Sequence, residues 1–149
     1  MTMRVYVDTS VIGGCLDEEF AEESQALLDM ARHGNLLLLV SDLLLEELAK
    51  APPAVLAVLA ELPPDATETL TTTEESRRLR DAYLAANVVG TASESDAHHV
   101  ALATVARADL IVSWNFKHIV HVDKIKMFNA VNLMHGYGLI DIRSPLEVV

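Results

Sequence analysis

The stretch Arg4-Val5-Tyr6-Val7-Asp8-Thr9-Ser10 sets the fold class of this chain. Its first four residues include a short β-branched and aromatic run, and a polar triplet follows directly. A run of this kind that stops at turn-forming residues is typical of a buried strand. We therefore predict a strand that delivers Asp8 to its carboxyl end, with residues 8–10 as a turn.

Two later apolar runs repeat this arrangement and alternate with helical segments. Residues 36–40 precede the polar Ser41, and residues 110–113 form another buried strand. Ser41 and Thr73 stand before helical patterns as N-caps. The predicted helices cover 18–33, 42–50, 54–61, 73–86, the segment from Ser93 or Ser95 to 107, and 124–134, and shorter strands cover 68–72 and 139–142.

Strands that alternate with helices favour a mostly parallel sheet with helices on both faces. We expect a three-layer α/β/α fold. The length suits one compact domain, and no repeat, low-complexity tract or linker divides residues 1–149. Residues 51–73 contain two proline pairs and are open to more than one interpretation. They form either a second core helix or a helical arm that projects from the core, and their apolar part also suits a dimer face.

Composition indicates a soluble globular protein. Hydrophobic residues make up 51% of the chain and charged residues 22%, which supplies a packed core and argues against disorder. No apolar run reaches the ~20 residues that cross a bilayer, and the start of the chain lacks the features of a signal peptide. The single cysteine, Cys15, excludes an internal disulfide and a cysteine-based zinc site. We expect a cytoplasmic protein that does not bind membranes.

The net charge argues against a basic nucleic-acid-binding surface. There are 11 Lys and Arg against 22 Asp and Glu, a formal charge of −11, whereas surfaces that bind phosphates are basic. Local basic clusters remain at 77–80 and 117–126. The acidic excess suits cation binding. Solubility is the commoner explanation, and a basic partner that covers part of the surface is a third.

Polar side chains gather at the predicted strand ends, where open α/β sheets carry their sites. Asp8 closes the first strand, Glu46 or Glu47 lies one turn into the helix after the second, and Asn115 follows a later strand. Asp96 opens the helix that precedes that strand. Four segments thus bring oxygen ligands to one edge of the sheet, and oxygen is the ligand that Mg²⁺ and Mn²⁺ prefer.

Such a cluster suits the hydrolysis of a phosphodiester. A divalent ion lowers the pKa of a bound water and stabilises charge on a phosphate under in-line attack. The protein then needs no covalent nucleophile of its own. The acidic cluster therefore predicts a metal-dependent nuclease, although any acidic protein offers some oxygens at helix and strand ends.

Four segments resemble, in order, the motifs of the PIN-domain family, which includes the ribonuclease toxins of the VapC type. Residues 5–12 (VYVDTSVI) are similar to the first acidic motif. Residues 40–48 (VSDLLLEEL) are similar to the second, in which a glutamate lies in the helix after the second strand. Residues 96–103 (DAHHVALA) and 108–115 (ADLIVSWN) are similar to the third and fourth. The resemblance spans most of the chain.

The resemblance implies a PIN-like fold and an endoribonuclease that depends on Mg²⁺ or Mn²⁺. Asp8, Glu47 and Asp96 would bind the metal, with Glu47 favoured over Glu46 by its spacing in the second motif. Asn115 would orient a water or complete the metal shell. RNA would be the substrate. The resemblance also implies a homodimer and, for a toxin, a small antitoxin partner.

Asn115 is a departure from the family, in which an aspartate often stands at this position. An asparagine still offers a carbonyl oxygen, but it removes one negative charge. This leaves a second function open, a catalytically weak or inactive PIN fold that acts through RNA or protein contacts. A receiver-type phosphoacceptor domain ranks well below both, because it usually needs paired acids near the first strand and Asp8 stands alone there.

Each candidate ligand also has an ordinary structural explanation. Asp8 and Asn115 can form turns, Asp96 suits the first turn of a helix, and Glu47 suits a solvated helix face. A carboxylate directly after a buried strand is costly, however, unless something binds it. We therefore favour metal binding at Asp8, and the motif matches favour it at Glu47 and Asp96, while the two interpretations of Asn115 stay balanced.

The neighbouring residues are expected to have structural roles. His98 and His99 point about 100° apart on a helix, so they rarely share one ion, and packing or hydrogen bonding is the favoured role. Trp114 is the only tryptophan and is expected in the core rather than stacked on a base. The arginines in 77–80 are expected to form a solvated helix face.

Overall fold

The computed structural model describes residues 2–149. Within these residues, five parallel strands form a sheet in the order β3-β2-β1-β4-β5, and seven α-helices surround it. The strands are β1 (Met3–Val7), β2 (Leu36–Ser41), β3 (Thr67–Leu70), β4 (Leu110–Val112) and β5 (Asp141–Arg143). The α-helices are α1 (Thr9–Gly14), α2 (Ala21–Arg32), α3 (Asp42–Ala49), α4 (Pro53–Ala60), α5 (Glu74–Ala85), α6 (Glu94–Val105) and α7 (Val122–Met134). Three short 3-10 helices are η1 (Pro64–Ala66), η2 (Thr91–Ser93) and η3 (Pro145–Glu147).

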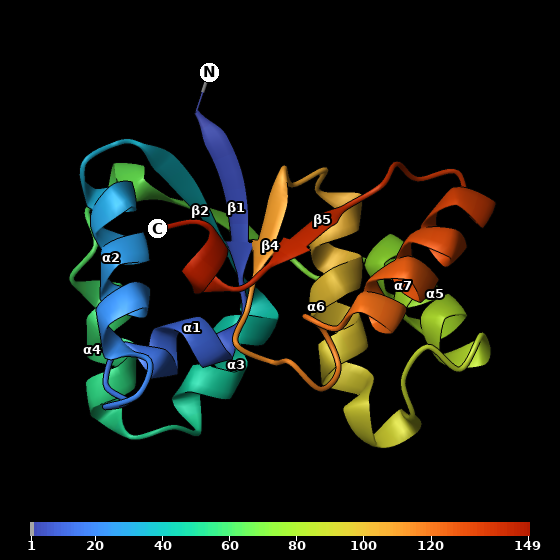
Figure 1. Ribbon diagram of the computed structural model, residues 1–149, viewed down its shortest axis with the longest axis horizontal. Coiled ribbons are helices and arrows are strands. Elements are labelled where there is room, and N and C mark those ends of the chain that lie inside the picture. Colours follow the sequence, from blue (N-terminus) through green and yellow to red (C-terminus); the bar gives the residue numbers. More distant parts are fainter. Residues whose placement is uncertain (1) are drawn as a thin grey trace.

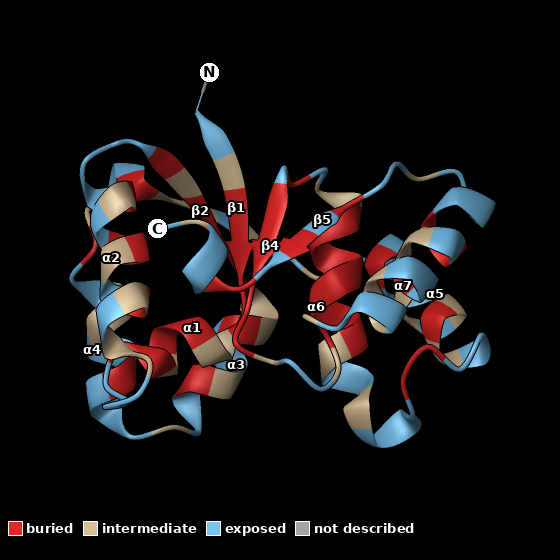
Figure 2. Cartoon of the chain, viewed as in Figure 1, coloured by how far each residue is buried: buried red, intermediate tan, exposed pale blue. Residues whose placement is uncertain are grey.

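The sheet is the middle of three layers (Figure 1). Helices α1 to α4 pack on one face, and α5 to α7 pack on the other. The prediction of a three-layer α/β/α fold with a mostly parallel sheet is confirmed, and the described sheet is parallel throughout. Figure 2 shows the consequence for burial, with the central strands covered and the helices exposed on their outward sides.

Side chains along the strands alternate between two cores. Val5 and Val7 pack with α1 to α4, whereas Tyr6 packs with α5 to α7. β2 and β4 alternate in the same way, so Leu39 and Ile111 join Tyr6 in the second core. Full burial of one such side chain stabilises the fold by roughly 1.5–3 kcal/mol. This alternation also decides which way the residues just beyond each strand point.

The register of the sheet aligns the carboxyl ends of three strands. Tyr6 of β1 pairs with Leu39 of β2 on one side and with Ile111 of β4 on the other. The residues two positions further, at 8, 41 and 113, therefore come to the same edge of the sheet. This edge is where the sequence predicts the site.

The prediction of a turn at residues 8–10 is wrong. Helix α1 begins at Thr9, directly after β1, and Asp8 stands at its N-cap position. Two glycines at the end of α1 weaken the helical signal in the sequence. Burial of Val11 and Ile12 against the sheet holds this short helix in place.

The other predicted elements are present with shifted ends. Ser41 and Thr73 cap α3 and α5 as predicted, through hydrogen bonds to Leu44 and Ser76. Helix α2 begins three residues later than predicted, and β5 begins two residues later. Shifts of this size are usual because helix and strand ends fray.

Residues 51–73 pack against the body of the protein. Val55, Leu62 and Ala66 are buried in the same core as α1 to α3, so the prediction of a projecting arm is wrong. The outer side of α4 is open, and Leu56 is 41% exposed. None of the helices in residues 2–149 is both long enough and apolar enough to span a membrane.

Candidate functional site

Asp8 is the most buried of the predicted site residues, with 4% of its surface exposed. Its Oδ1 accepts a hydrogen bond of 2.5 Å from the Ser10 hydroxyl, and its Oδ2 accepts one of 2.7 Å from the Ser113 hydroxyl. Burial raises the pKa of Asp8 and Asp96 raises it further, while His99 and the two hydroxyls act in the opposite direction. Within residues 2–149, Asp8 forms no salt bridge. A buried carboxylate in this position is a group that a cation would stabilise.

Ser10 and Ser113 also connect Asp8 to the loop that follows β4. The Ser10 hydroxyl accepts a hydrogen bond of 2.9 Å from the backbone N–H of Trp114. The Ser113 hydroxyl accepts one of 2.9 Å from the backbone N–H of Asn115. The two serines therefore hold the Asp8 carboxylate in one orientation between β1 and the β4 loop.

Glu47 reaches the same edge of the sheet from α3, with 32% of its side chain exposed. Its Oε1 accepts hydrogen bonds from Thr9 Oγ1 at 2.7 Å and from His99 Nε2 at 2.6 Å. Burial by itself raises the pKa of Glu47, but the interactions with His99, Thr9 and Lys50 together outweigh it, and the net pKa lies below the ordinary value. Glu46 is exposed and lines a pocket that does not include Glu47. The structure thus brings Glu47, rather than Glu46, into contact with α1 and α6.

His99 belongs to a buried network behind Glu47. Its Nδ1 lies 2.5 Å from the hydroxyl of Tyr6, and that hydroxyl lies 2.8 Å from Ser41 Oγ. The hydrogen-bonding role predicted for His99 is therefore confirmed. Tyr6 was not among the predicted site residues, although its alternation with Val5 and Val7 separates it from the first core.

Asp96 and Asn115 occupy different positions at this site. Asp96 is half-buried in the first turn of α6, close enough to Asp8 to raise its pKa, and its carboxylate accepts no hydrogen bond within residues 2–149. Asn115 is also half-buried, but its Oδ1 accepts a hydrogen bond of 2.9 Å from the backbone N–H of His118. Asn115 therefore stabilises the turn after β4, which is the structural role that the sequence left open for it.

The donor chemistry of these residues fits a hard divalent ion. Asp8, Glu47 and Asp96 offer carboxylate oxygens, and no hydrogen bond within residues 2–149 engages Oε2 of Glu47. In the described part of the chain, no three His, Cys, Asp or Glu side chains are gathered tightly enough to form a ready-made metal site. Mg²⁺ usually keeps several bound waters and contacts only one or two carboxylates directly. A Mg²⁺ site therefore does not require three such side chains in direct contact with the ion.

A polar pocket of about 440 Å³ lies beside Glu46 at the amino ends of α3 and α6. It is lined by Asp42, Leu43, Glu46, Thr72, Arg77, Arg80, Glu94, Ser95 and His98. Arg80 pairs with Glu94 at 3.1 Å and its side chain is only 18% exposed, so the prediction of a solvated arginine face is wrong for this residue. Burial and the nearby Arg80 lower the pKa of His98 to about 4, which leaves its imidazole neutral at pH 7.

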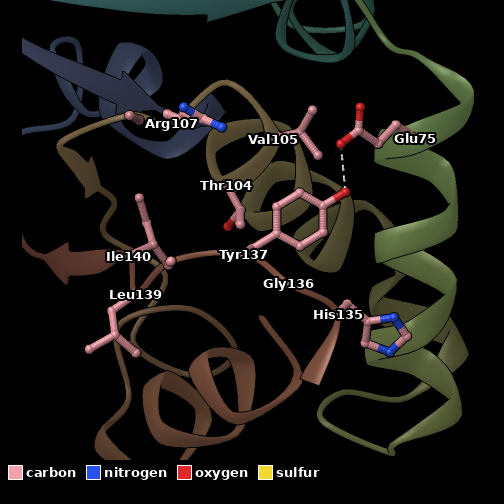
Figure 3. A pocket seen from close by; sticks show the side chains of 11 residues that line it. Glu75, Thr104, Val105, Arg107, His135, Gly136, Tyr137, Leu139 and Ile140 are labelled. Carbon is pink, nitrogen blue, oxygen red and sulfur yellow. Dashed lines mark hydrogen bonds between the residues drawn. The ribbon is translucent and has the colours of Figure 1, made fainter. Parts of the chain in front are cut away.

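A larger pocket of about 780 Å³ is lined by residues that precede β4 and β5, at the amino ends of these strands. Figure 3 shows its lining side chains from close by. The end of α6 and the segment between α7 and β5 form it, and Tyr137 donates a hydrogen bond of 2.7 Å to Glu75 across it. Its lining includes none of the predicted site residues. The large pocket and the acidic cluster are therefore separate features.

The sequence of this chain matches a known family over most of its length. A sequence model described as the PIN domain matches residues 4–117, which is more than half of the chain. The chain belongs to the PIN-domain family. In this PIN-domain protein, the matched range contains Asp8, Glu47, Asp96 and Asn115. The expected resemblance is thereby confirmed.

Solved structures contain the same fold. One is the crystal structure of VapBC2 from Rickettsia felis bound to a DNA fragment from their promoter. Its matching chain superposes with a TM-score of 0.60 over 95% of this PIN-domain protein and 98% of that chain, at 12% sequence identity. At that identity the likeness concerns the fold. No curated protein is significantly similar to this one in sequence.

Proposed function

We propose that this PIN-domain protein is a metal-dependent endoribonuclease and that residues 1–149 form a single catalytic domain. One observation carries the proposal most strongly. Asp8 is buried at the carboxyl edge of the sheet, with a raised pKa, and within the described residues only hydroxyl groups contact its carboxylate by hydrogen bonds. Asp96 adds a second negative charge nearby. An arrangement that costs free energy in this way is typical of a site built for a cation.

Asp8, Glu47 and Asp96 are the proposed ligands for Mg²⁺ or Mn²⁺. A bound divalent ion would generate a nucleophile from water near neutral pH and offset charge on the phosphate. The serines at 10 and 113 hold Asp8, and Thr9 holds Glu47, so that the carboxylates keep their orientation. Asn115 is proposed to orient a water through its amide while it stabilises the loop.

The biological setting is also a proposal. The fold likeness to a chain in the VapBC2 structure is compatible with the toxin of a toxin–antitoxin pair that acts on cellular RNA in the cytoplasm. A small antitoxin protein and a second copy of this chain are the proposed partners. A basic antitoxin would complement the formal charge of −11.

A catalytically weak binding module is the second candidate function. The observation in its favour is the hydrogen bond between Asn115 Oδ1 and the N–H of His118, which engages the oxygen that a ligand role would use. In that case, the PIN fold would act through RNA or protein contacts, without efficient cleavage.

Cleavage of a mixed RNA pool by the purified protein tests the proposal. The reactions contain Mg²⁺, Mn²⁺ or EDTA, and they compare the unaltered protein with Asp8→Asn and with the exposed control Asp65→Asn. We expect cleavage in either metal, none in EDTA, and a loss of at least 100-fold in Asp8→Asn alone. If the folded protein cuts in no condition while still binding RNA or a partner, the binding module replaces the enzyme.

A further inference from the structure

A chain of hydrogen bonds begins and ends on α3 and passes through β1 and α6. The backbone N–H of Leu44 donates to Ser41 Oγ at 3.1 Å, and Ser41 Oγ lies 2.8 Å from the hydroxyl of Tyr6. The Tyr6 hydroxyl lies 2.5 Å from Nδ1 of His99, and Nε2 of His99 lies 2.6 Å from Oε1 of Glu47. The start of α3 is thereby linked to a carboxylate one turn further along the same helix.

For a singly protonated His99 ring, the chemistry of the groups gives every link one direction. An ionised carboxylate only accepts hydrogen bonds, so Nε2 of His99 carries the hydrogen that faces Glu47. In the neutral ring, Nδ1 is then an acceptor, and it takes the hydrogen of the Tyr6 hydroxyl. Ser41 accepts from Leu44 and donates to the Tyr6 oxygen. With this tautomer of His99, each hydrogen in the series of hydrogen bonds has one acceptor.

Burial makes this network rigid. Tyr6 and Ser41 are fully buried, and His99 is 2% exposed. Burial also raises the pKa of Tyr6, which keeps its hydroxyl protonated as a donor. An unsatisfied polar group in such surroundings costs free energy, so the alternative orientations of the imidazole are disfavoured.

The two donors to Glu47 act on the same oxygen. Thr9 Oγ1 and His99 Nε2 both contact Oε1, from α1 and from α6. Oε2 is left without a hydrogen bond within residues 2–149. The carboxylate of Glu47 is thus held through Oε1, while Oε2 is free to contact another group.

We propose that His99 is a positioning residue for Glu47. It holds Oε1, with Tyr6 and Ser41 behind it, so that Oε2 is presented to the divalent ion. This inference rests on the proposed function, because it takes Glu47 as a metal ligand. His99 would thus affect the affinity for the metal through Glu47, without contacting the metal itself.

Two amide variants of His99 provide the test. Glutamine places its terminal NH₂ near the position of Nε2 and can still donate to Glu47, whereas asparagine is one methylene shorter and cannot reach it. Both remove the ring from the core. We expect His99→Asn to weaken Mn²⁺ binding about 10-fold or more, which is the usual effect of losing an outer-shell partner, and His99→Gln to stay within about 3-fold.

The measurement is the dissociation constant for Mn²⁺, from the free-ion signal in electron paramagnetic resonance without RNA. Equal affinity in His99→Asn and the unaltered protein overturns the inference, and so does equal weakening in both variants, which would reflect lost packing. Asp8→Asn separates the two proposals. If it weakens Mn²⁺ binding and His99→Asn does not, the positioning role fails alone. If the unaltered protein binds no Mn²⁺, the metal site fails and the inference with it.

A second measurement needs no metal. Long-range ¹H–¹⁵N correlation spectra of the histidine ring report which nitrogen carries the hydrogen. We expect hydrogen on Nε2 of His99 in the unaltered protein, and a changed ring signal in Tyr6→Phe, which removes the donor to Nδ1. A neutral ring with its hydrogen on Nδ1 would overturn the network whatever the metal data show.

Discussion

Ser113 donates a hydrogen bond of 2.7 Å to Asp8, although 105 residues separate them along the chain. The contact exists because β1 and β4 are parallel neighbours whose registered pairs include Tyr6 with Ile111. Alternation then turns residues 8 and 113 toward the same face of the sheet. The carboxylate of Asp8 is buried there, and its burial lowers the stability of the folded protein when the group is ionised.

Asp8→Asn is expected to stabilise the metal-free protein at pH 7. The pKa of Asp8 is raised in the folded state, so its ionised form is penalised above that pKa. Below the ordinary aspartate pKa of about 3.9, the group is protonated whether the chain is folded or not, and the penalty disappears. We expect a gain of about 1–2 kcal/mol at pH 7, or roughly 2–8 °C in Tm, that shrinks as the pH falls toward 4.

Thermal melts by circular dichroism in EDTA measure this effect. The exposed variant Asp65→Asn serves as the control for removal of one negative charge. A lower Tm for Asp8→Asn at pH 7 would contradict the prediction, and would mean that the hydroxyl contacts of Asp8 outweigh its burial.

Glu47→Gln and Glu46→Gln are neighbouring isosteric changes with different expected results. Glu47 contacts Thr9 and His99 at the acidic cluster, whereas Glu46 is exposed and lines a pocket that does not include Glu47. We expect Glu47→Gln to lower RNA cleavage at least 100-fold and to weaken Mn²⁺ binding, and Glu46→Gln to change either less than 3-fold. The same loss in both variants would argue for a general electrostatic effect and against a ligand role for Glu47.

Asn115→Asp is expected to tighten metal binding while the loop keeps its structure. An aspartate at this position can still accept the hydrogen bond from His118, and it adds one negative charge beside the cluster. We expect the dissociation constant for Mn²⁺ to fall at least 3-fold. Asn115→Ala removes the acceptor instead, and should cost about 1 kcal/mol of stability. Unchanged Mn²⁺ affinity in Asn115→Asp would place this side chain outside the metal shell.

Gly14→Ala is expected to disturb the only tryptophan, while Gly13→Ala leaves it unchanged. A Cβ at Gly14 would lie 2.6 Å from Ser24 Oγ and 3.0 Å from Nε1 of Trp114, whereas a Cβ at Gly13 meets no atom within 4 Å. These two groups form a hydrogen bond of 2.8 Å, which the added methyl must displace. We expect Gly14→Ala to lose about 1–3 kcal/mol and to shift the fluorescence of Trp114.

Intrinsic fluorescence and urea unfolding report both effects of the glycine changes. Gly13→Ala should be neutral or slightly stabilising, because alanine favours a helix more than glycine does. Identical spectra and stabilities for the two variants would show that α1 moves freely enough to absorb the methyl group.

Cys15 is expected to be inert toward thiol reagents in the folded protein. Its side chain is buried, and burial raises its pKa to about 11, so the reactive thiolate is scarce at pH 8. We expect labelling with a disulfide-exchange reagent to be at least 100-fold slower in the native protein than in urea, where one thiol per chain reacts. Rapid native labelling would indicate that α1 opens readily beside the site.

Local patterns in the sequence were sufficient to predict most of the fold. These patterns are the apolar runs, the caps at Ser41 and Thr73 and the alternation of strands with helices. Each depends only on residues that are close together in the sequence, so they were sufficient to predict a parallel three-layer arrangement. Helix α1 was not predicted because two adjacent glycines weaken the helical pattern in the sequence. The helix is stabilised by packing against the sheet. The arm suggested for residues 51–73 was wrong for a related reason, since only tertiary contacts bury Val55 and Leu62.

The sequence by itself determined that acidic residues at positions 8, 47 and 96 belong to successive strand ends and helix starts of one sheet. Only the tertiary structure decided how they are held. Tyr6 and His99 are 93 residues apart, and Asp8 and Ser113 are 105 apart, yet each pair shares a hydrogen bond. Spacing along the chain encodes which face of an element a residue occupies. Whether Oε1 or Oε2 of Glu47 accepts the hydrogen bonds depends on the distances between the elements. Those distances are set when β1, α3, α6 and the β4 loop pack together.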